Sequence, residues 1–284
     1  MIPVPRRVPI GGGRALDVRE AGDGVPLVLL HGFPLDHSMW CGQWSLVAPG
    51  GALEGRARLV VPDLAGFGRS DGPATPSIAG MADDVASLLD AVAPGRPAVA
   101  CGLSMGGYVA QHLATRHGNR LAGLVLVDTK LEADSVEARA ARRDLAERVA
   151  RVGSRIAAEA MVPRLVARGT DAAIDLTPPG RAVVEDRLRR TIEETSVATI
   201  RTALEALGDR PDMTAAAAGI DLPTLLVVGA EDAITPPECL ELAARTIARS
   251  ELVVVPRCGH LTPLEDPAAF NAALAAFVTA RIRH

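Results

Sequence analysis

Residues 102–106, Gly-Leu-Ser-Met-Gly, place one serine between two glycines, directly after an apolar run and directly before a helix-forming one. Serine suits the interior of neither element and glycine weakens both, so a local requirement must hold them there. The spacing fits the G-x-S-x-G turn between a strand and a helix, which strains its serine and exposes the hydroxyl. Ser104 is therefore the candidate nucleophile, although these five residues alone also fit a helix N-cap in a tight turn.

A serine hydroxyl is a weak nucleophile and needs a histidine base that is oriented by a carboxylate. His260 follows the last apolar run of the chain, and Asp232 follows the run before it. The chain order Ser104, Asp232, His260 is the order found in serine hydrolases with an open α/β sheet. Asp128, at the end of an earlier apolar run, is the alternative carboxylate, because some folds of this kind place the acid one strand earlier. We favour Asp232.

Acyl transfer also needs hydrogen-bond donors for the oxyanion of the tetrahedral intermediate. One expected donor is the backbone N–H of Met105, which follows the candidate nucleophile. The second is expected from the loop after residues 27–32; Pro34 has no N–H, so Phe33 is the candidate. His31 is expected to brace that loop rather than to act in the chemistry. Asp63, after a later apolar run, is expected to order its own loop through backbone hydrogen bonds.

Short apolar runs that alternate with amphipathic segments must position these residues, and this alternation indicates an α/β protein with a mostly parallel sheet flanked by helices. Most of the runs are continuously apolar, as expected of central strands that are covered on both faces. Because ligands bind beyond the carboxyl ends of such strands, the candidate residues should gather at one edge of the sheet. The expected strands are 14–22, 26–32, 58–64, 97–104, 121–129, 222–232 and 251–260, and the expected helices outside the long helical segment are 81–92, 105–117, 237–248 and 267–282.

A long segment between two of these strands has helical periodicity and no strand signal. We expect a core domain of residues 1–130 and 218–284, with residues 131–217 inserted as an all-helical cap over the carboxyl edge of the sheet. The cap should supply most of the wall of a substrate pocket. Tentative pocket residues are Met39 and Trp40 of the loop after Phe33, and Met161 and Leu165 of the cap. Three cap arginines could attract a carboxylate-bearing lactone, although solvated helix faces are the simpler interpretation of them: Arg139, Arg142 and Arg164.

The overall composition excludes several other classes of function. The 284 residues carry a formal net charge of −4, which gives no electrostatic reason to expect a nucleic acid or an anionic membrane as partner. Aromatic residues make up only 2% of the chain, so no stacking platform for bases is indicated. No run approaches the roughly 18 apolar residues of a membrane span, and the N-terminal residues lack the apolar segment of a signal peptide. We expect a cytoplasmic protein.

Cofactor and metal signatures are missing from the sequence. The four cysteines have neither zinc-site spacing nor the number needed for a disulfide scaffold. There is no G-x-x-x-x-G-K phosphate loop, and no G-x-G-x-x-G fingerprint follows the first strand. We therefore predict no cofactor and no metal, with a small molecule as the partner and a monomer or homodimer as the assembly.

Beyond these single motifs, the chain resembles the α/β-hydrolase superfamily, in its single-domain type with a helical cap. The resemblance rests on LLHGFPLDHSMW, VVPDLAGFGRSDGP, CGLSMGGYVAQHLA, LVLVDT, RPDMTAAAAGIDLPTLLVVGAEDAITP and CGHLTPLEDPAAFNAALAAFV, and covers nearly the whole chain outside the cap. HGFPLD, GLSMGG and LVLVDTKLEAD are most similar to the enol-lactonase, carboxylesterase and cofactor-free haloperoxidase-like group. The resemblance implies a catalytic triad of Ser104, Asp232 and His260, with oxyanion donors Phe33 and Met105. It implies hydrolysis of a small-molecule ester or lactone through an acyl-enzyme.

Other reactions of this superfamily match less well. Epoxide hydrolases and haloalkane dehalogenases of this fold carry an aspartate where this chain has Ser104, and carbon–carbon bond hydrolases usually carry an asparagine where it has Leu103. Two alternatives stay open. The same triad could serve an acyltransferase or thioesterase of a biosynthetic pathway, or the fold could bind a small ligand without catalysis, since a fold does not by itself fix an activity.

Overall fold

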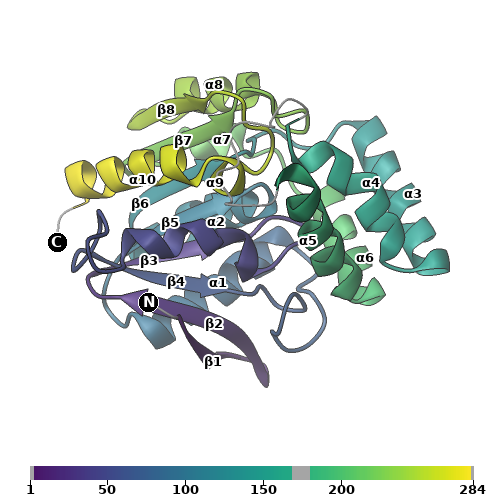
Figure 1. The fold of residues 1–284 in the computed structure, drawn as a ribbon, viewed down its shortest axis with the longest axis horizontal. Coiled ribbons are helices and arrows are strands. Elements are labelled where there is room, and N and C mark those ends of the chain that lie inside the picture. The colour runs from purple at the N-terminus through teal and green to yellow at the C-terminus, as the bar shows by residue number, and fades with distance from the viewer. Residues whose placement is uncertain (1–2, 168–179, 283–284) are drawn as a thin grey trace.

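An eight-stranded sheet forms the centre of the computed structural model, which describes residues 3–167 and 180–282 (Figure 1). Its strand order is β1-β2-β4-β3-β5-β6-β7-β8. β2 pairs antiparallel with both β1 and β4, and all other neighbours are parallel. The strands are β1 (Val4–Gly11), β2 (Arg14–Gly22), β3 (Val25–Leu30), β4 (Ala57–Pro62), β5 (Ala98–Leu103), β6 (Leu121–Val127), β7 (Thr224–Gly229) and β8 (Ser250–Val255).

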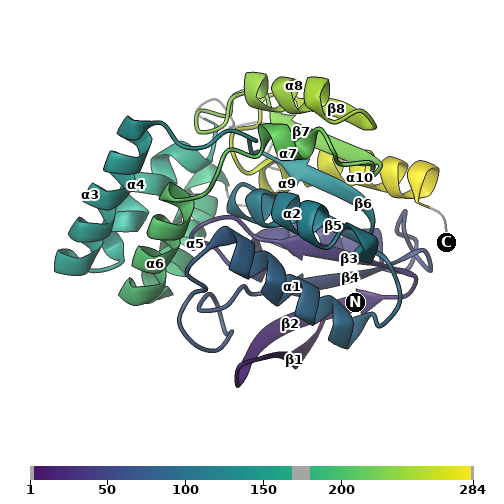
Figure 2. The same ribbon diagram turned by 180° about the vertical axis from the view of Figure 1, so that it is seen from behind.

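Every residue of β3, β5 and β7 is buried, which explains why these strands are continuous apolar runs in the sequence. α1 and α2 lie on one face of the sheet and α10 on the other, as the two opposite views show (Figures 1 and 2). The helices of the core are η1 (a 3₁₀ segment, His37–Leu46), α1 (Ile78–Val92), α2 (Met105–Arg116), η2 (Gly118–Arg120), α8 (Pro237–Thr246), α9 (Thr262–Glu265) and α10 (Pro267–Arg281).

The first strand, β1, was not predicted from the sequence. β1 contains Pro5 and Pro9, which the interior of a sheet does not tolerate, but β1 is the edge strand and pairs only with β2. Only Val8 and Ile10 of this strand are buried, so it has no continuous apolar run to reveal it. At the opposite edge the expected strand 251–260 is too long, because β8 ends at Val255 and a loop follows it.

All regular elements described between β6 and β7 are helices. Two of them begin at serine N-caps, Ser135 and Ser196, whose hydroxyls accept from the backbone N–H three residues later. Figure 1 shows α3–α6 grouped to one side of the sheet. Residues 168–179 of the predicted cap lie outside the described residues. We call residues 131–217 the helical insertion; its helices are α3 (Val136–Val152), α4 (Arg155–Leu165), α5 (Gly180–Glu194), α6 (Val197–Gly208) and α7 (Thr214–Ala217).

The two connections between the helical insertion and the sheet are fastened to each other. The N–H of Met213 donates to the carbonyl of Leu131 at 2.9 Å, and the guanidinium of Arg210 pairs with the buried carboxylate of Asp134 at 2.9 Å. The same guanidinium lies 4.1 Å from the centre of the Tyr108 ring on α2, a cation–π contact. The base of the insertion therefore rests on the helix that follows residue 104. No helix in the described ranges combines the length and hydropathy that crossing a membrane requires.

Candidate active site

The turn between β5 and α2 holds Ser104 in a strained backbone conformation, with φ 52° and ψ −112°. Its N–H donates to the carbonyl of Val127, at the end of β6, at 2.9 Å. A Cβ at Gly106 would lie 2.2 Å from the carbonyl oxygen of Leu30, so only glycine fits there. These sterics explain the glycine spacing, and they leave Ser104 at the N-terminus of α2, where the helix dipole favours negative charge.

The loop after β3 lies directly against this serine. A Cβ built on Gly32 would be 3.5 Å from the Cβ of Ser104 and 2.9 Å from a methyl carbon of Leu103. The next residue of the loop is Phe33, which is buried, as is Met105 on the other side of the serine. The structure thus brings together the two backbone segments from which we predicted the oxyanion donors.

The side chains of Asp232 and His260 form a buried hydrogen-bonded pair. The distance from the Oδ2 of Asp232 to the Nδ1 of His260 is 2.8 Å, and both side chains are at most 3% exposed. Oδ1 accepts from the backbone N–H groups of Ile234 at 2.8 Å and Thr235 at 3.0 Å, while the hydroxyl of Thr235 donates to Oδ2 at 2.8 Å. The carboxylate is therefore held in place, and it fixes a proton on Nδ1, which leaves Nε2 free to act as a base.

The electrostatics of the pair favour a charged imidazole. Burial lowers the pKa of His260, but the charge of Asp232 and its hydrogen bond outweigh burial and raise that pKa above the ordinary 6.5. Burial opposes ionisation of Asp232, but the His260 charge and the same hydrogen bond hold the pKa of this carboxyl below its ordinary value. Such a pair stabilises the imidazolium that forms when the ring accepts a proton.

Asp128, the alternative acid, is buried beside this pair but bonds elsewhere. It accepts from the N–H of Gly229 at 3.0 Å, and from the N–H and hydroxyl of Thr262 at 3.0 and 2.9 Å. Burial and the nearby charge of Asp232 raise the pKa of Asp128 to about 8. The carboxyl that bonds the ring of His260 is that of Asp232, so the geometry favours Asp232 for the role of the acid.

Two further predicted residues order the loops around the site. The Nδ1 of His31 lies 3.0 Å from the carbonyl oxygen of the next residue, and its Nε2 accepts from the N–H of Leu64 at 3.0 Å. Burial lowers the pKa of His31, so the ring is neutral and braces the loop that it belongs to. Asp63 accepts from the backbone N–H groups of His37 at 2.8 Å and Arg69 at 2.9 Å, and the second of these bonds orders its own loop.

The tentative pocket residues take different places in the structure. Trp40 is fully buried, with its ring 6.0 Å from that of Phe270 in the core. Met39 is buried in the same loop, and its sulfur accepts a backbone N–H at 3.4 Å. Leu165 is buried at the end of α4, where its carbonyl accepts the backbone N–H of the candidate histidine at 3.1 Å, and Met161 is half-buried. Leu165 is thus the tentative pocket residue that contacts the Asp232–His260 pair directly.

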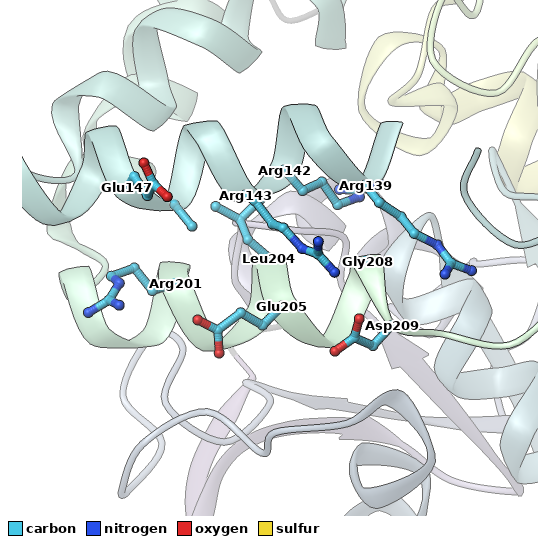
Figure 3. Close-up of a pocket in the computed structure, with 10 residues that line it drawn as sticks. Arg139, Arg142, Arg143, Glu147, Arg201, Leu204, Glu205, Gly208 and Asp209 are labelled. Atoms are coloured by element: carbon cyan, nitrogen blue, oxygen red, sulfur yellow. The ribbon is translucent and has the colours of Figure 1, made fainter. Parts of the chain in front are cut away.

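The arginines proposed to attract a carboxylate lie on α3 and α4 of the helical insertion. Arg139 and Arg142 line a hollow of about 250 Å³ between α3 and α6, which is smaller than a typical ligand pocket (Figure 3). The hollow is of mixed charge, and Arg142 is already bonded to Asp134 at 2.5 Å. Arg164 is exposed on α4. None of the predicted catalytic, oxyanion or pocket residues lines this hollow. Its lining residues are Arg139, Arg142, Arg143, Ala146, Glu147, Arg201, Leu204, Glu205, Gly208 and Asp209.

One group of side chains has the donor types of a metal site. Ligand atoms of Asp36, His37 and Asp63 lie within 4.8 Å of one another. Their lone pairs already have partners, because Asp36 caps η1 by accepting from the N–H of Ser38 at 2.9 Å and Asp63 accepts from both the backbone and the ring of His37. The cluster is explained by these hydrogen bonds.

Two residues that position the candidate site, Thr235 and Glu265, were not predicted from the sequence. Thr235 fixes the candidate acid, and its position three residues after Asp232 was the signal that could have revealed it. Glu265 is fully buried and accepts backbone N–H groups on both sides of His260. Glu265 stands next to Asp266 in the sequence, and such acidic pairs are usually exposed, so the sequence carried no signal that Glu265 would be buried.

Comparison with known proteins gives a consistent picture. The family model described as "Alpha/beta hydrolase family" matches residues 27–273. A thermophilic esterase from Thermogutta terrifontis is 36% identical, with a TM-score of 0.88 over 99% of this chain and 100% of that one. The enol-lactonase from Burkholderia xenovorans LB400 is 27% identical, with a TM-score of 0.83 over 96% of this chain and 100% of that one.

A curated relative adds a further kind of hydrolase. The 2-hydroxymuconate semialdehyde hydrolase of Pseudomonas sp. (strain CF600) is 28% identical over 95% of this chain and 92% of its own length. The matches to this protein, the esterase and the enol-lactonase extend over nearly the whole chain. The predicted fold class and the resemblance from which we started are therefore confirmed.

Proposed function

Since the chain belongs to the α/β-hydrolase family, we propose that it is a serine hydrolase that cleaves a carboxylic ester or lactone of a small molecule through an acyl-enzyme on Ser104. The observation that carries the proposal is the buried pair of Asp232 and His260 at 2.8 Å, on the same sheet edge as a serine with φ 52°. An esterase and an enol-lactonase among the similar structures support this substrate class.

The proposed reaction has two acyl-transfer steps. The Nε2 of His260 accepts the proton of the Ser104 hydroxyl while its oxygen attacks the substrate carbonyl, and Asp232 stabilises the resulting imidazolium. The N–H groups of Phe33 and Met105 bind the oxyanion. The intermediate collapses as His260 returns the proton to the departing alcohol or enol oxygen. Water then attacks the acyl-enzyme by the same route and releases the acid and free Ser104.

We further propose that the helical insertion acts as the cap of the active site, over a core of residues 1–130 and 218–284. Leu165 and Met161 of α4 would then form part of the pocket wall, because the end of α4 is hydrogen-bonded to the backbone of His260. A small molecule is the partner that such a covered site accepts.

The test is the hydrolysis of p-nitrophenyl esters from acetate to decanoate by the wild type and by Ser104→Ala. We expect the variant to lose on the order of 10⁴-fold or more in kcat, as triad enzymes do when the nucleophile is removed. Ser87→Ala is the matched control, because its hydroxyl lies on α1 and donates to the carbonyl of Asp83 one turn earlier. A folded wild type that neither turns over an ester nor reacts with a fluorophosphonate would refute the proposal.

A further inference from the structure

Glu265, at the end of α9, is a buried carboxylate that the proposed reaction does not use. It is 0% exposed. Its Oε1 accepts from the N–H of Leu261 at 3.0 Å, its Oε2 accepts from the N–H of Ala167 at 2.8 Å, and both oxygens lie 3.0 Å from the nitrogen of Gly259. The donors Ala167, Gly259 and Leu261 precede Glu265 by 98, 6 and 4 residues along the chain.

Gly259 and Leu261 are the two neighbours of His260, so one carboxylate holds the backbone on both sides of the histidine. The N–H of His260 itself donates to the carbonyl of Leu165 at 3.1 Å. A Cβ at Gly259 would lie 2.5 Å from the nitrogen of Ala167, so the histidine loop and the end of α4 are in close backbone contact. The loop is thus fixed from the core by α9 and from the helical insertion by residues 165–167.

The ionised form of Glu265 suits this environment. All the hydrogen bonds described for its carboxyl group come from backbone N–H donors, and a carboxylate accepts while a protonated carboxyl would aim one O–H at a donor. Burial raises the pKa of Glu265 above its ordinary 4.5, and the hydrogen bonds from these backbone donors limit that rise. Three carboxyl groups then face His260, those of Asp232, Asp128 and Glu265.

We propose that Glu265 is a positioning residue: it fixes the His260 ring where the ring can accept the Ser104 proton, and it couples that position to residues 165–167 of the helical insertion. This inference rests on the proposed function. A carboxylate that merely stabilised the fold would change the melting temperature of the protein but not the kinetics of the histidine.

Glu265→Gln tests the inference, because the amide keeps the size of the side chain but turns an NH₂ group toward N–H donors. We expect kcat for the best p-nitrophenyl ester to fall about 10- to 100-fold, as a displacement of about 1 Å causes, with KM within about threefold of the wild type. Loss of a negative charge that faces His260 should also move the acid limb of kcat/KM to lower pH. Labelling by a fluorophosphonate should slow in proportion to kcat.

Asp266→Asn is the matched control. Asp266 is the adjacent carboxylate and accepts from the N–H of Ala269 at the N-cap of α10, where asparagine caps equally well. We expect its kcat and acid limb to be those of the wild type. A folded Glu265→Gln variant with wild-type kcat and an unmoved acid limb, whatever its melting temperature, would overturn the inference.

If Glu265→Gln does not fold, Glu265→Asp is the second variant. It keeps the negative charge, but its side chain is one methylene shorter and cannot reach both the N–H of Ala167 and the N–H groups of Gly259 and Leu261. We expect kcat to fall severalfold with the acid limb unmoved, and wild-type kcat in this variant would overturn the coupling. Wild-type esterase activity that Ser104→Ala abolishes separates these outcomes from a failure of the proposed function, which would overturn both proposals.

Discussion

Replacing Asp232 by asparagine removes a charge without changing the size of the side chain. Oδ1 of Asp232 accepts two backbone N–H groups, and Oδ2 accepts from the Thr235 hydroxyl and from His260. An asparagine whose oxygen keeps the two backbone bonds must direct its NH₂ group at the Nδ1 of His260. The ring then carries its proton on Nε2 and cannot accept one from Ser104. Because a wrong tautomer costs about 10⁴-fold in other triad enzymes, we expect kcat of Asp232→Asn to fall by about that factor.

Asp128→Asn is the matched variant for this experiment. Its carboxyl bonds Gly229 and Thr262 and not the ring of His260, and asparagine keeps the size of the side chain and one acceptor oxygen. We expect kcat within about tenfold of the wild type and a loss of stability of about 1–3 kcal/mol from the altered hydrogen bonds. The assay is steady-state hydrolysis of the best p-nitrophenyl ester at pH 7, with thermal unfolding of each variant.

Two results would refute this reasoning. Asp232→Asn with kcat within tenfold of the wild type would show that the tautomer of His260 does not depend on this carboxylate. The reverse pattern, with Asp128→Asn inactive and Asp232→Asn active, would assign the acid to the end of β6 rather than to the end of β7.

Three further predictions concern stability and pH. Asp134→Asn breaks the buried pair with Arg210 and should lower the free energy of unfolding by about 3 kcal/mol, on the order of 6 °C in Tm. Burial opposes the ionisation of Asp134, but the hydrogen bonds from arginines hold the pKa of this carboxyl below its ordinary 3.8, so the pair stabilises the protein above pH 3.8 and loses that effect as the pH falls through the lowered pKa. Tm measured against pH should show this loss in the wild type and not in the variant. Gly106→Ala, whose Cβ would meet the Leu30 carbonyl at 2.2 Å, should cost about 1–3 kcal/mol or more in thermal unfolding, whereas Gly118→Ala, with nothing within 4 Å, should not; equal Tm values would contradict the steric argument. The acid limb of kcat/KM should have its midpoint above 6.5, because burial lowers the pKa of His260 but Asp232 raises it further and the ring must be neutral to act as the base; a midpoint below 6.5 in a pH–rate profile would contradict this assignment.

The sequence by itself determined the local features of the candidate site. The glycines around Ser104 mark a turn between a strand and a helix, and their spacing is visible in five consecutive residues, although the groups that exclude a Cβ at Gly106 belong to the end of β3. The buried parallel strands are apolar runs because both of their faces are covered, and the order of Ser104, Asp232 and His260 follows from the order of those strands. Even the bracing role of His31 could be predicted from its place in a short loop.

Tertiary structure alone decided which distant groups meet. Asp128 and Asp232 both follow buried strands that are neighbours in the sheet. Only the packing of the loops beyond these strands decides that the ring of His260 is hydrogen-bonded to Asp232. Trp40 lies in the core, and the burial of Glu265 is offset by three backbone N–H donors, one of which, that of Ala167, is 98 positions away along the chain. The residue types and spacing of a turn can be recognised in neighbouring residues, whereas burial and the choice of partner depend on segments that only the folded sheet brings together.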